Sequence, residues 1–313
     1  MAERPYISWL GHGAADLAPP GIFTDARANF FAFSASRPAM QSLADALLNP
    51  AGMGKVRYEV PLGLAVASFM DIARCTSASE IMGWLPGREC ALFVPLIETH
   101  RGHPLKTRFV LWAPYIFISY TIGMVTGREL WGWPKVLAEI SPADDLEGPG
   151  LSCATTYFPT LATETRGVTG PLLTVRRTAA GPAAPVWRDG LEAAEGLVGA
   201  LLGDLAGVLI AALKLKPQAP SVALKQFRQA GAASQACYQA ICDSPIEVTA
   251  FKGGGPRLDS FELEVATCES HPIVRDLLGR DPDPVSTKLP VVFAAWAVID
   301  FQALSGADVI VAA

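Results

Sequence analysis

Charged residues are scarce in this sequence, and basic residues do not predominate among them. Only 18% of the 313 residues are charged and the formal net charge is -5, whereas an average globular protein is roughly 25% charged. A mildly acidic chain attracts phosphate backbones poorly, so nucleic-acid binding is not expected. Hydrophobic residues make up 50% of the chain. This excludes a disordered protein, because so much apolar surface can offset the entropy lost on folding.

The sequence also lacks the usual signals of secretion, disulfide bonding and metal binding. The N-terminus has no basic start followed by an apolar core, so no secretory signal is expected. Six cysteines occur without a C-x-x-C pair, and we interpret them as small buried thiols in a reducing cytoplasm. His100 and His103 share a polar connection but lack a third ligand, so no metal site is expected. The prediction is a cytoplasmic protein without a bound metal.

One apolar segment, residues 197–213, could imitate a membrane span. It has about 17 residues, the lower limit for crossing a bilayer, and it carries Asp204 near its centre. Its glycines recur every three or four residues, which places small side chains on one helical face. We interpret it as a helix that is buried or faces another subunit, within a helical insertion at 178–216. The expectation is therefore a homo-oligomer that does not enter a membrane.

Most of the remaining chain is predicted to form short strands. A helix is expected at 38–48, with Pro38 at its start, and Gly253–Gly255 is interpreted as a turn. Runs of aromatic, β-branched and other apolar residues give the strand candidates 29–33, 91–97, 109–122, 151–161, 167–177, 223–228, 236–250, 260–267 and 291–302. Many strands, few helices and short connections predict a β-rich α+β fold, a barrel or a sandwich, in one domain spanning 1–313.

The most distinctive chemistry lies at 127–138, which reads Gly-Arg-Glu-Leu-Trp-Gly-Trp-Pro-Lys-Val-Leu-Ala. Lys135 follows two tryptophans and precedes Val136 and Leu137. Burying an ammonium group disfavours its charged form, and a neutral amine can attack a carbonyl to form a Schiff base. The protonated imine then withdraws electrons from a neighbouring bond, as decarboxylation or aldol cleavage requires. The alternative is a lysine whose stem covers apolar surface while its ammonium group reaches water.

This stretch resembles the signature of the acetoacetate decarboxylase family, roughly G-R-E-[IL]-x-G-[FYW]-P-K-K-L, with Val136 in place of the second lysine. The resemblance implies a cone-shaped β-barrel with flanking helices, assembled into oligomers. It also implies that Lys135 is the Schiff-base lysine. By the same resemblance, Glu89 is the active-site glutamate, and Arg27 is the arginine that binds a substrate carboxylate.

The chemistry of these side chains suits those roles, although each has a structural alternative. Glu89 could move protons or orient the substrate, or it could pair with a cation. Arg27 could hold a carboxylate by a bidentate contact, or it could form a surface or structural ion pair. A further set completes the candidate site: Trp131 and Trp133 either line the substrate pocket or belong to the core, and Arg128 and Glu129 brace the turn.

The leading expectation is a carbon–carbon lyase without a cofactor, which decarboxylates an acetoacetate-like β-keto acid through Lys135. Val136 removes the neighbouring cation of the family pattern, so that locally only desolvation is left to activate the lysine. Two alternatives stay open. One is an aldolase or dehydratase that acts on a pyruvate-like 2-oxo acid with the same lysine, and the other is a non-catalytic barrel that binds a small molecule.

Overall fold

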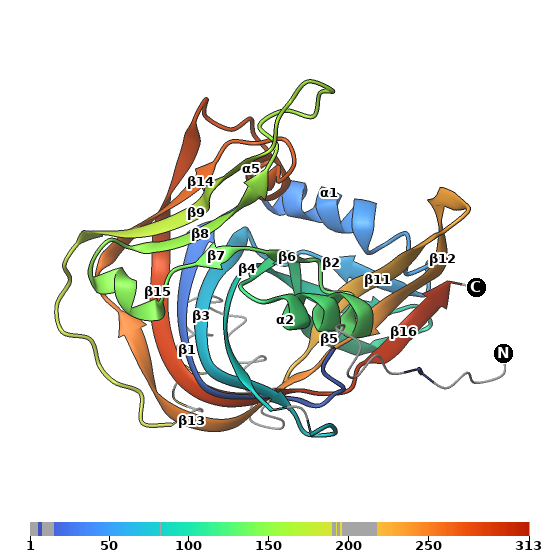
Figure 1. Ribbon diagram of the computed structural model, residues 1–313, viewed down its shortest axis with the longest axis horizontal. Coiled ribbons are helices and arrows are strands. Elements are labelled where there is room, and N and C mark those ends of the chain that lie inside the picture. Colours follow the sequence, from blue (N-terminus) through green and yellow to red (C-terminus); the bar gives the residue numbers. More distant parts are fainter. Residues whose placement is uncertain are drawn as a thin grey trace.

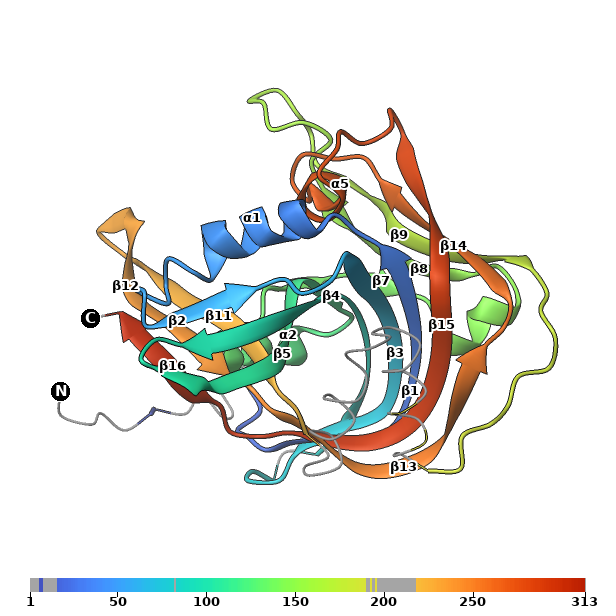
Figure 2. The same ribbon diagram turned by 180° about the vertical axis from the view of Figure 1, so that it is seen from behind.

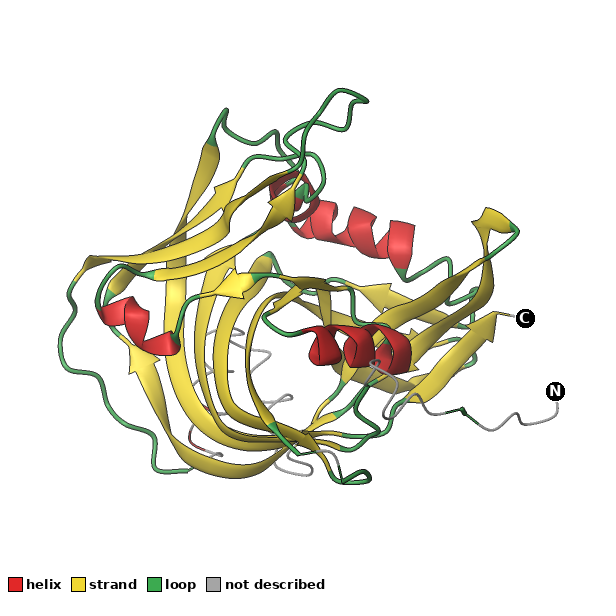
Figure 3. Ribbon diagram, viewed as in Figure 1, coloured by secondary structure: helices red, strands yellow, loops and turns green. Residues whose placement is uncertain are grey.

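A computed structural model describes residues 6–7, 16–81, 83–189, 192, 195 and 218–312. Strands predominate in these ranges (Figure 3). The strands are β1 (Gly21–Ser34), β2 (Val56–Glu59), β3 (Leu64–Ser77), β4 (Leu85–His100), β5 (His103–Ile118), β6 (Lys135–Leu137), β7 (Glu139–Ile140), β8 (Leu151–Tyr157), β9 (Val168–Ala179), β10 (Gln218–Ala219), β11 (Ser221–Gln229), β12 (Ala232–Asp243), β13 (Ile246–Arg257), β14 (Ser260–Ala266), β15 (Ser286–Ala303) and β16 (Ala307–Ala312). The helical elements are α1 (Arg37–Leu47), α2 (Thr121–Thr126), the π-helical turn η1 (Gly127–Trp131), the 3₁₀ turn η2 (Ala143–Glu147) and α5 (Ile273–Leu278).

The hydrogen-bonded strands follow one open path. Its order is β16-β12-β11-β5-β4-β3-β1-β15-β14-β9-β8-β7, with β2 beside β4, β6 beside β5, and β10 beside β13, which pairs with β15. All of these pairings are antiparallel except those of β5 with β11 and with β6. The prediction of a strand-rich fold with few helices is confirmed. The described strands do not close on themselves, so the cone-shaped barrel is not confirmed.

The long strands β1, β3 and β15 bend around one wide curve (Figures 1 and 2). One face of these strands carries large apolar side chains, among them Phe31 and Phe69, which pack against the layer formed by β8, β9 and β14. Phe31 meets Phe261 of β14 edge to face, with ring centroids 5.3 Å apart. This contact closes the main core between the two layers. Because side chains alternate along a strand, the other face carries a different set, including the fully buried Ala26 and Ala28.

The sequence located most elements but misplaced some of their ends. The expected helix corresponds to α1, where Ser36 caps the first turn by accepting a hydrogen bond from the amide of Ala39. The candidate 109–122 is too long, because β5 ends at Ile118 and the chain then turns into α2. The candidate 236–250 is two strands, β12 and β13. Pro245 lies at the break, and proline cannot donate to a strand ladder.

The glycine triplet 253–255 was expected to be a turn, and this prediction is wrong. The triplet lies within β13, opposite residues 296–298 of β15. A Cβ on Gly254 would come 2.8 Å from the carbonyl oxygen of Trp296, and one on Gly255 would come 2.6 Å from the carbonyl oxygen of Pro185. Glycine is therefore used here for close backbone approach within a strand rather than for a tight turn.

The proposed insertion at 178–216 falls largely outside the described residues. Strand β9 continues through Ala179, and residues 180–189 form no helix or strand. In the described ranges no helix is both long enough and apolar enough to span a bilayer. All six cysteines are free. Five of them are buried as predicted, but Cys237 is exposed, so the prediction of a buried thiol is wrong for this residue.

Candidate active site

The motif at 127–138 folds as a compact turn that leads into a short strand. Helix α2 continues into η1, and Gly132 ends this helical stretch in the left-handed conformation at φ 73°. A Cβ on Gly132 would lie 2.5 Å from Cα of Lys225 on β11. Glycine is therefore required both by the positive φ angle and by the close approach of the two backbones. The amide of Trp133 then donates to the carbonyl of Gly127, and β6 begins at Lys135.

Lys135 and Glu89 form a close ion pair in the structure. Nζ of Lys135 lies 2.7 Å from Oε2 of Glu89, and the two side chains are 7% and 22% exposed. Strand pairing explains the contact, because both residues flank β5: Lys135 lies beside Ile116 and Glu89 beside Ile118. Two residues that are 46 positions apart in the chain are thereby brought into direct contact.

The backbone around Lys135 shapes the path of its side chain. A Cβ on Gly127 would lie 2.5 Å from Cδ and 2.8 Å from Cε of Lys135, so the lysine stem passes directly over this glycine. The guanidinium group of Arg128 donates to the carbonyl oxygen of Lys135 at 3.1 Å, which is a contact expected of a residue that braces the turn. Arg128 and Glu129 are both exposed.

The two tryptophans of the motif stack on each other but occupy different positions. Their ring centroids are 4.6 Å apart, with an interplanar angle of 26°. Trp131 is buried and its indole nitrogen donates to the carbonyl oxygen of Leu304. Trp133 is only partly buried, and Nζ of Lys135 lies 4.8 Å from the centre of its ring. Trp131 therefore anchors the pair in the protein, while Trp133 faces the amine.

Val136 occupies the position of the second lysine in the family pattern. It pairs with Phe117 and packs against the main apolar core. Side chains alternate along a strand, so Val136 points to the opposite face of β6 from Lys135. The valine therefore replaces a side chain that this backbone would direct away from the amine.

The structure does not bring Arg27 to this pair. In the strand register Arg27 lies opposite Asp71, and Asp71 lies opposite Arg88. The adjacent row of cross-strand partners begins at Ala28 on β1 and ends at Glu89 on β4. Adjacent rows point to opposite faces of a sheet, so Arg27 and Glu89 lie on different faces.

The contacts of Arg27 agree with this placement. Its side chain is 52% exposed and forms an ion pair with Asp144. Within the described part of the chain it has no ion pair or hydrogen bond with Lys135 or Glu89. The structural alternative for Arg27, an exposed ion pair, is the arrangement that the structure contains.

Two residues that the sequence analysis did not single out lie beside the pair. Tyr120 follows β5 two positions after Ile118, and its hydroxyl lies near the thiol of Cys75 on β3. Cys75 is fully buried, and both residues interact electrostatically with Glu89. Burial, followed by the nearby Cys75 and Glu89, raises the pKa of Tyr120 above its usual value. No local sequence signal marks these residues, because their proximity depends on the register of three strands.

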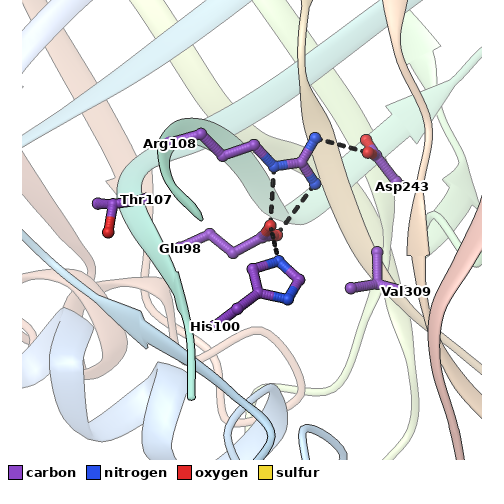
Figure 4. Close-up of a pocket in the computed structure, with 6 residues that line it drawn as sticks. All are labelled: Glu98, His100, Thr107, Arg108, Asp243 and Val309. Atoms are coloured by element: carbon purple, nitrogen blue, oxygen red, sulfur yellow. Dashed lines mark hydrogen bonds and ion pairs between the residues drawn. The ribbon is translucent and has the colours of Figure 1, made fainter. Parts of the chain in front are cut away.

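A second charged cluster lines a hollow of about 480 Å³ at the other end of β4 (Figure 4). Glu98 is fully buried and accepts two hydrogen bonds from the guanidinium group of Arg108, at 2.8 and 3.1 Å. His100 and Tyr58 also contact its carboxylate, and Arg108 reaches Asp243 at 2.6 Å. Burial alone would raise the pKa of Glu98, but the hydrogen bonds and charge of Arg108 outweigh it and lower that pKa.

Among the residues that the structure describes, no group of three or more His, Cys, Asp or Glu side chains is arranged to hold a metal ion. The chemistry available near Lys135 is that of an amine, a carboxylate, a phenol, a thiol and an indole.

Comparison with known proteins relates the chain to solved structures only. No family model matches the sequence, and no curated protein matches it. Acetoacetate decarboxylase from Legionella pneumophila has a similar structure, with a TM-score of 0.57 and 14% identity, covering 100% of this chain and 98% of that one. The enduracididine biosynthesis enzyme MppR gives a TM-score of 0.55 at 13% identity, covering 97% and 92%.

A third similar structure is an acetoacetate decarboxylase-like enzyme from Sphingomonas wittichii RW1. It has a TM-score of 0.55 and 14% identity, and the match covers 94% of each chain. The resemblance that the motif suggested is therefore confirmed at the level of structure. The chain has the fold of the acetoacetate decarboxylase-like enzymes.

The substitution Gly127→Ala tests the close packing of the lysine stem. We expect it to destabilise the protein by about 1–3 kcal/mol, because the new methyl group would overlap the stem and displace it. Gly231→Ala is the control, since a Cβ there meets no atom within 4 Å, and its effect should stay within about 0.5 kcal/mol. Urea unfolding measures both. Equal stability of the two variants would contradict the packing described here.

The buried cluster around Glu98 predicts a loss of stability in acid. Its lowered pKa means that the stabilisation is present above the unfolded-state value, about 4.3, and is lost as the pH falls through the folded-state value. Urea midpoints measured between pH 3 and 7 should fall less steeply in acid for Glu98→Gln than for the parent protein. Glu59→Gln, at an exposed ion pair, should keep the steep acid limb; a parent-like profile for Glu98→Gln would refute this account.

Proposed function

We propose that this protein is a Schiff-base-forming carbon–carbon lyase in which Lys135 is the nucleophile, and that its substrate is a β-keto acid of the acetoacetate type. The observation that carries the proposal is the buried amine of Lys135, with a carboxylate oxygen of Glu89 2.7 Å away. Such a pair is the minimum that imine chemistry needs, a nucleophile and a group that moves its protons. The shared fold supports the assignment to this class of enzyme.

Glu89 has a defined task in this proposal. An ammonium group has no lone pair, so Lys135 must lose a proton before its nitrogen can attack a carbonyl carbon. Oε2 of Glu89 is within direct hydrogen-bond distance of Nζ and accepts that proton. Because Lys135 is nearly inaccessible to water, the carboxylate rather than solvent is the immediate proton acceptor.

Trp133 would stabilise the positive charge that the reaction keeps at this nitrogen. The ring centre lies 4.8 Å from Nζ, within the range of a cation–π contact. The nitrogen is cationic as the ammonium and again as the iminium. The indole face is therefore suited to both, and stacking on the anchored Trp131 holds it in place.

Decarboxylation follows from the iminium. The bond between the α-carbon and the carboxylate breaks, and its electron pair moves toward the cationic nitrogen to form an enamine and carbon dioxide. A proton adds to the enamine carbon, and water then hydrolyses the imine to release the ketone and the free lysine. The protein supplies no redox equivalent in any of these steps.

An aldolase or dehydratase that acts on a pyruvate-like 2-oxo acid is the second candidate. One structure of MppR, at 11% identity and a TM-score of 0.55, is described as a complex with the condensation product of pyruvate and imidazole 4-carboxaldehyde. That chemistry would use the same imine of Lys135 and the same proton transfers by Glu89. A homo-oligomeric state and a cytoplasmic location remain predictions from the sequence.

Borohydride reduction tests the nucleophile. With acetoacetate or pyruvate present, we expect the parent protein to gain the mass of a reduced adduct on Lys135, because borohydride converts an imine into a stable amine. Lys135→Ala should show no adduct and should lose at least about 1,000-fold in turnover, as expected when a covalent nucleophile is removed. Lys252→Ala is the control, since Lys252 is an exposed lysine in surface ion pairs. A Lys135→Ala variant that still turned over would disprove the proposal.

Product analysis separates the candidate reactions. The decarboxylase proposal predicts release of carbon dioxide from acetoacetate and no consumption of aldehyde with pyruvate. Consumption of an aldehyde in the presence of pyruvate, without release of carbon dioxide, would contradict the decarboxylase proposal and support the aldolase or dehydratase. Reversible binding of carbonyl compounds with no trappable imine would instead indicate a non-catalytic binding protein.

A further inference from the structure

Tyr120 is held beside the Lys135–Glu89 pair by an arrangement that leaves its ring little freedom. A Cβ on Gly87 would lie 2.2 Å from Cε1 of Tyr120, and a Cβ on Gly123 would lie 2.5 Å from Cε2 and Cζ. The ring thus fills the space that two glycines leave open, one on β4 and one on α2. Any larger residue at either position would expel it.

The strand register places this ring on the same face of the sheet as the Lys135–Glu89 pair. Gly87 lies two positions before Glu89 on β4, and Tyr120 lies two positions after Ile118, which is the cross-strand partner of Glu89. Residues two apart on a strand share a face, and neighbours on that face are about 7 Å apart. The ring that packs over Gly87 therefore lies on the same face of the sheet as Glu89, two residues away along β4.

The hydroxyl group of Tyr120 is a hydrogen-bond donor that lies near a weak acceptor. It lies near the thiol of Cys75, and sulfur is a poor acceptor, so turning the hydroxyl toward an oxygen atom costs little. Burial raises the pKa of Cys75 to about 11, and burial with the nearby acidic groups raises that of Tyr120. Both groups therefore keep their protons near neutral pH, which suits a hydrogen-bond donor and rules out a thiolate nucleophile.

We propose that Tyr120 is a catalytic residue that donates a hydrogen bond to the substrate's carbonyl oxygen while Lys135 adds to the carbonyl carbon. As the C–N bond forms, the π electron pair of the carbonyl moves onto oxygen, and a fixed donor stabilises the charge that develops there. The inference rests on the proposed function, because it concerns the same imine.

Protons balance without consuming the tyrosine. The ammonium of Lys135 carries three protons: two leave with the carbonyl oxygen as water, and one stays on the iminium nitrogen. Glu89 transfers these two protons from the nitrogen to the carbonyl oxygen, one after the other, and ends as a carboxylate. Tyr120 donates a hydrogen bond and keeps its proton.

Tyr120→Phe tests this role, because phenylalanine keeps the ring between the two glycines and removes only the hydroxyl. Samples of protein mixed with acetoacetate, or separately with pyruvate, are quenched with borohydride over time and analysed by intact mass. We expect imine formation on Lys135 to slow about 100-fold, the loss typical of one such donor. The concentration for half-saturation should change by less than about threefold, and thermal unfolding should stay close to the parent.

Tyr115→Phe is the matched control. Tyr115 lies on β5 and belongs to the other face of the sheet, where its hydroxyl donates to Asp276 at 2.5 Å. This variant loses a half-buried tyrosine hydroxyl close in sequence to Tyr120, and its imine formation should match that of the parent protein.

The pH profile separates a donor from a merely structural residue. If Tyr120 keeps its proton throughout, Tyr120→Phe should lower the rate of imine formation by the same factor at every pH from 5 to 9. A disturbed Lys135–Glu89 pair would instead shift the midpoint of the profile, and such a shift would overturn the inference. Parent-like rates for Tyr120→Phe would also overturn it while leaving Lys135 as the nucleophile. A parent protein that forms no adduct with either acid would overturn the proposed function and this inference together.

Discussion

The candidate chemistry of this fold depends on one buried ion pair, that of Lys135 with Glu89. An ammonium group that is 7% exposed would be costly to bury alone, and a carboxylate 2.7 Å away compensates for much of the lost hydration. The same carboxylate can take the proton that the amine must lose before it reacts. One contact therefore offsets the cost of burying the ammonium group and, in the proposed reaction, provides the acceptor for its proton.

The surroundings of this pair depend on small residues as much as on reactive ones. Gly127 leaves room for the lysine stem, Gly132 lets the turn approach β11, and Gly87 makes space for the ring of Tyr120. Each glycine lies where a Cβ would meet another atom at 2.5 Å or less. The position of the amine is thus defined by close packing, and close packing is what holds a catalytic group in a productive geometry.

The sheet separates two charged networks by sending them to opposite faces. The row that contains Arg27, Asp71 and Arg88 forms ion pairs around η2, whereas the next row presents Glu89 to Lys135. Arg88 is adjacent to Glu89 in sequence, but its side chain therefore points to the opposite face of the sheet from Lys135. The structures with this fold include a decarboxylase and an enzyme captured with a pyruvate condensation product. The fold alone leaves the reaction open, because one fold can carry different chemistries.

Local chemistry was readable directly from the order of residues. The tryptophans before Lys135 and the apolar residues after it indicated a lysine in an apolar setting, and runs of β-branched and aromatic residues indicated a strand-rich fold. These features depend on neighbours in the chain, whose effects on backbone angles and burial are short-ranged. Arg27 shows where such reasoning ends, because a shift of one residue in register moves a side chain to the other face of a sheet. The pairing of strands far apart in sequence decided the rest. It determined which cation contacts Glu89, that Tyr120 and Cys75 lie near it, and that Gly253–Gly255 continue a strand. No single segment of the sequence encodes this pairing.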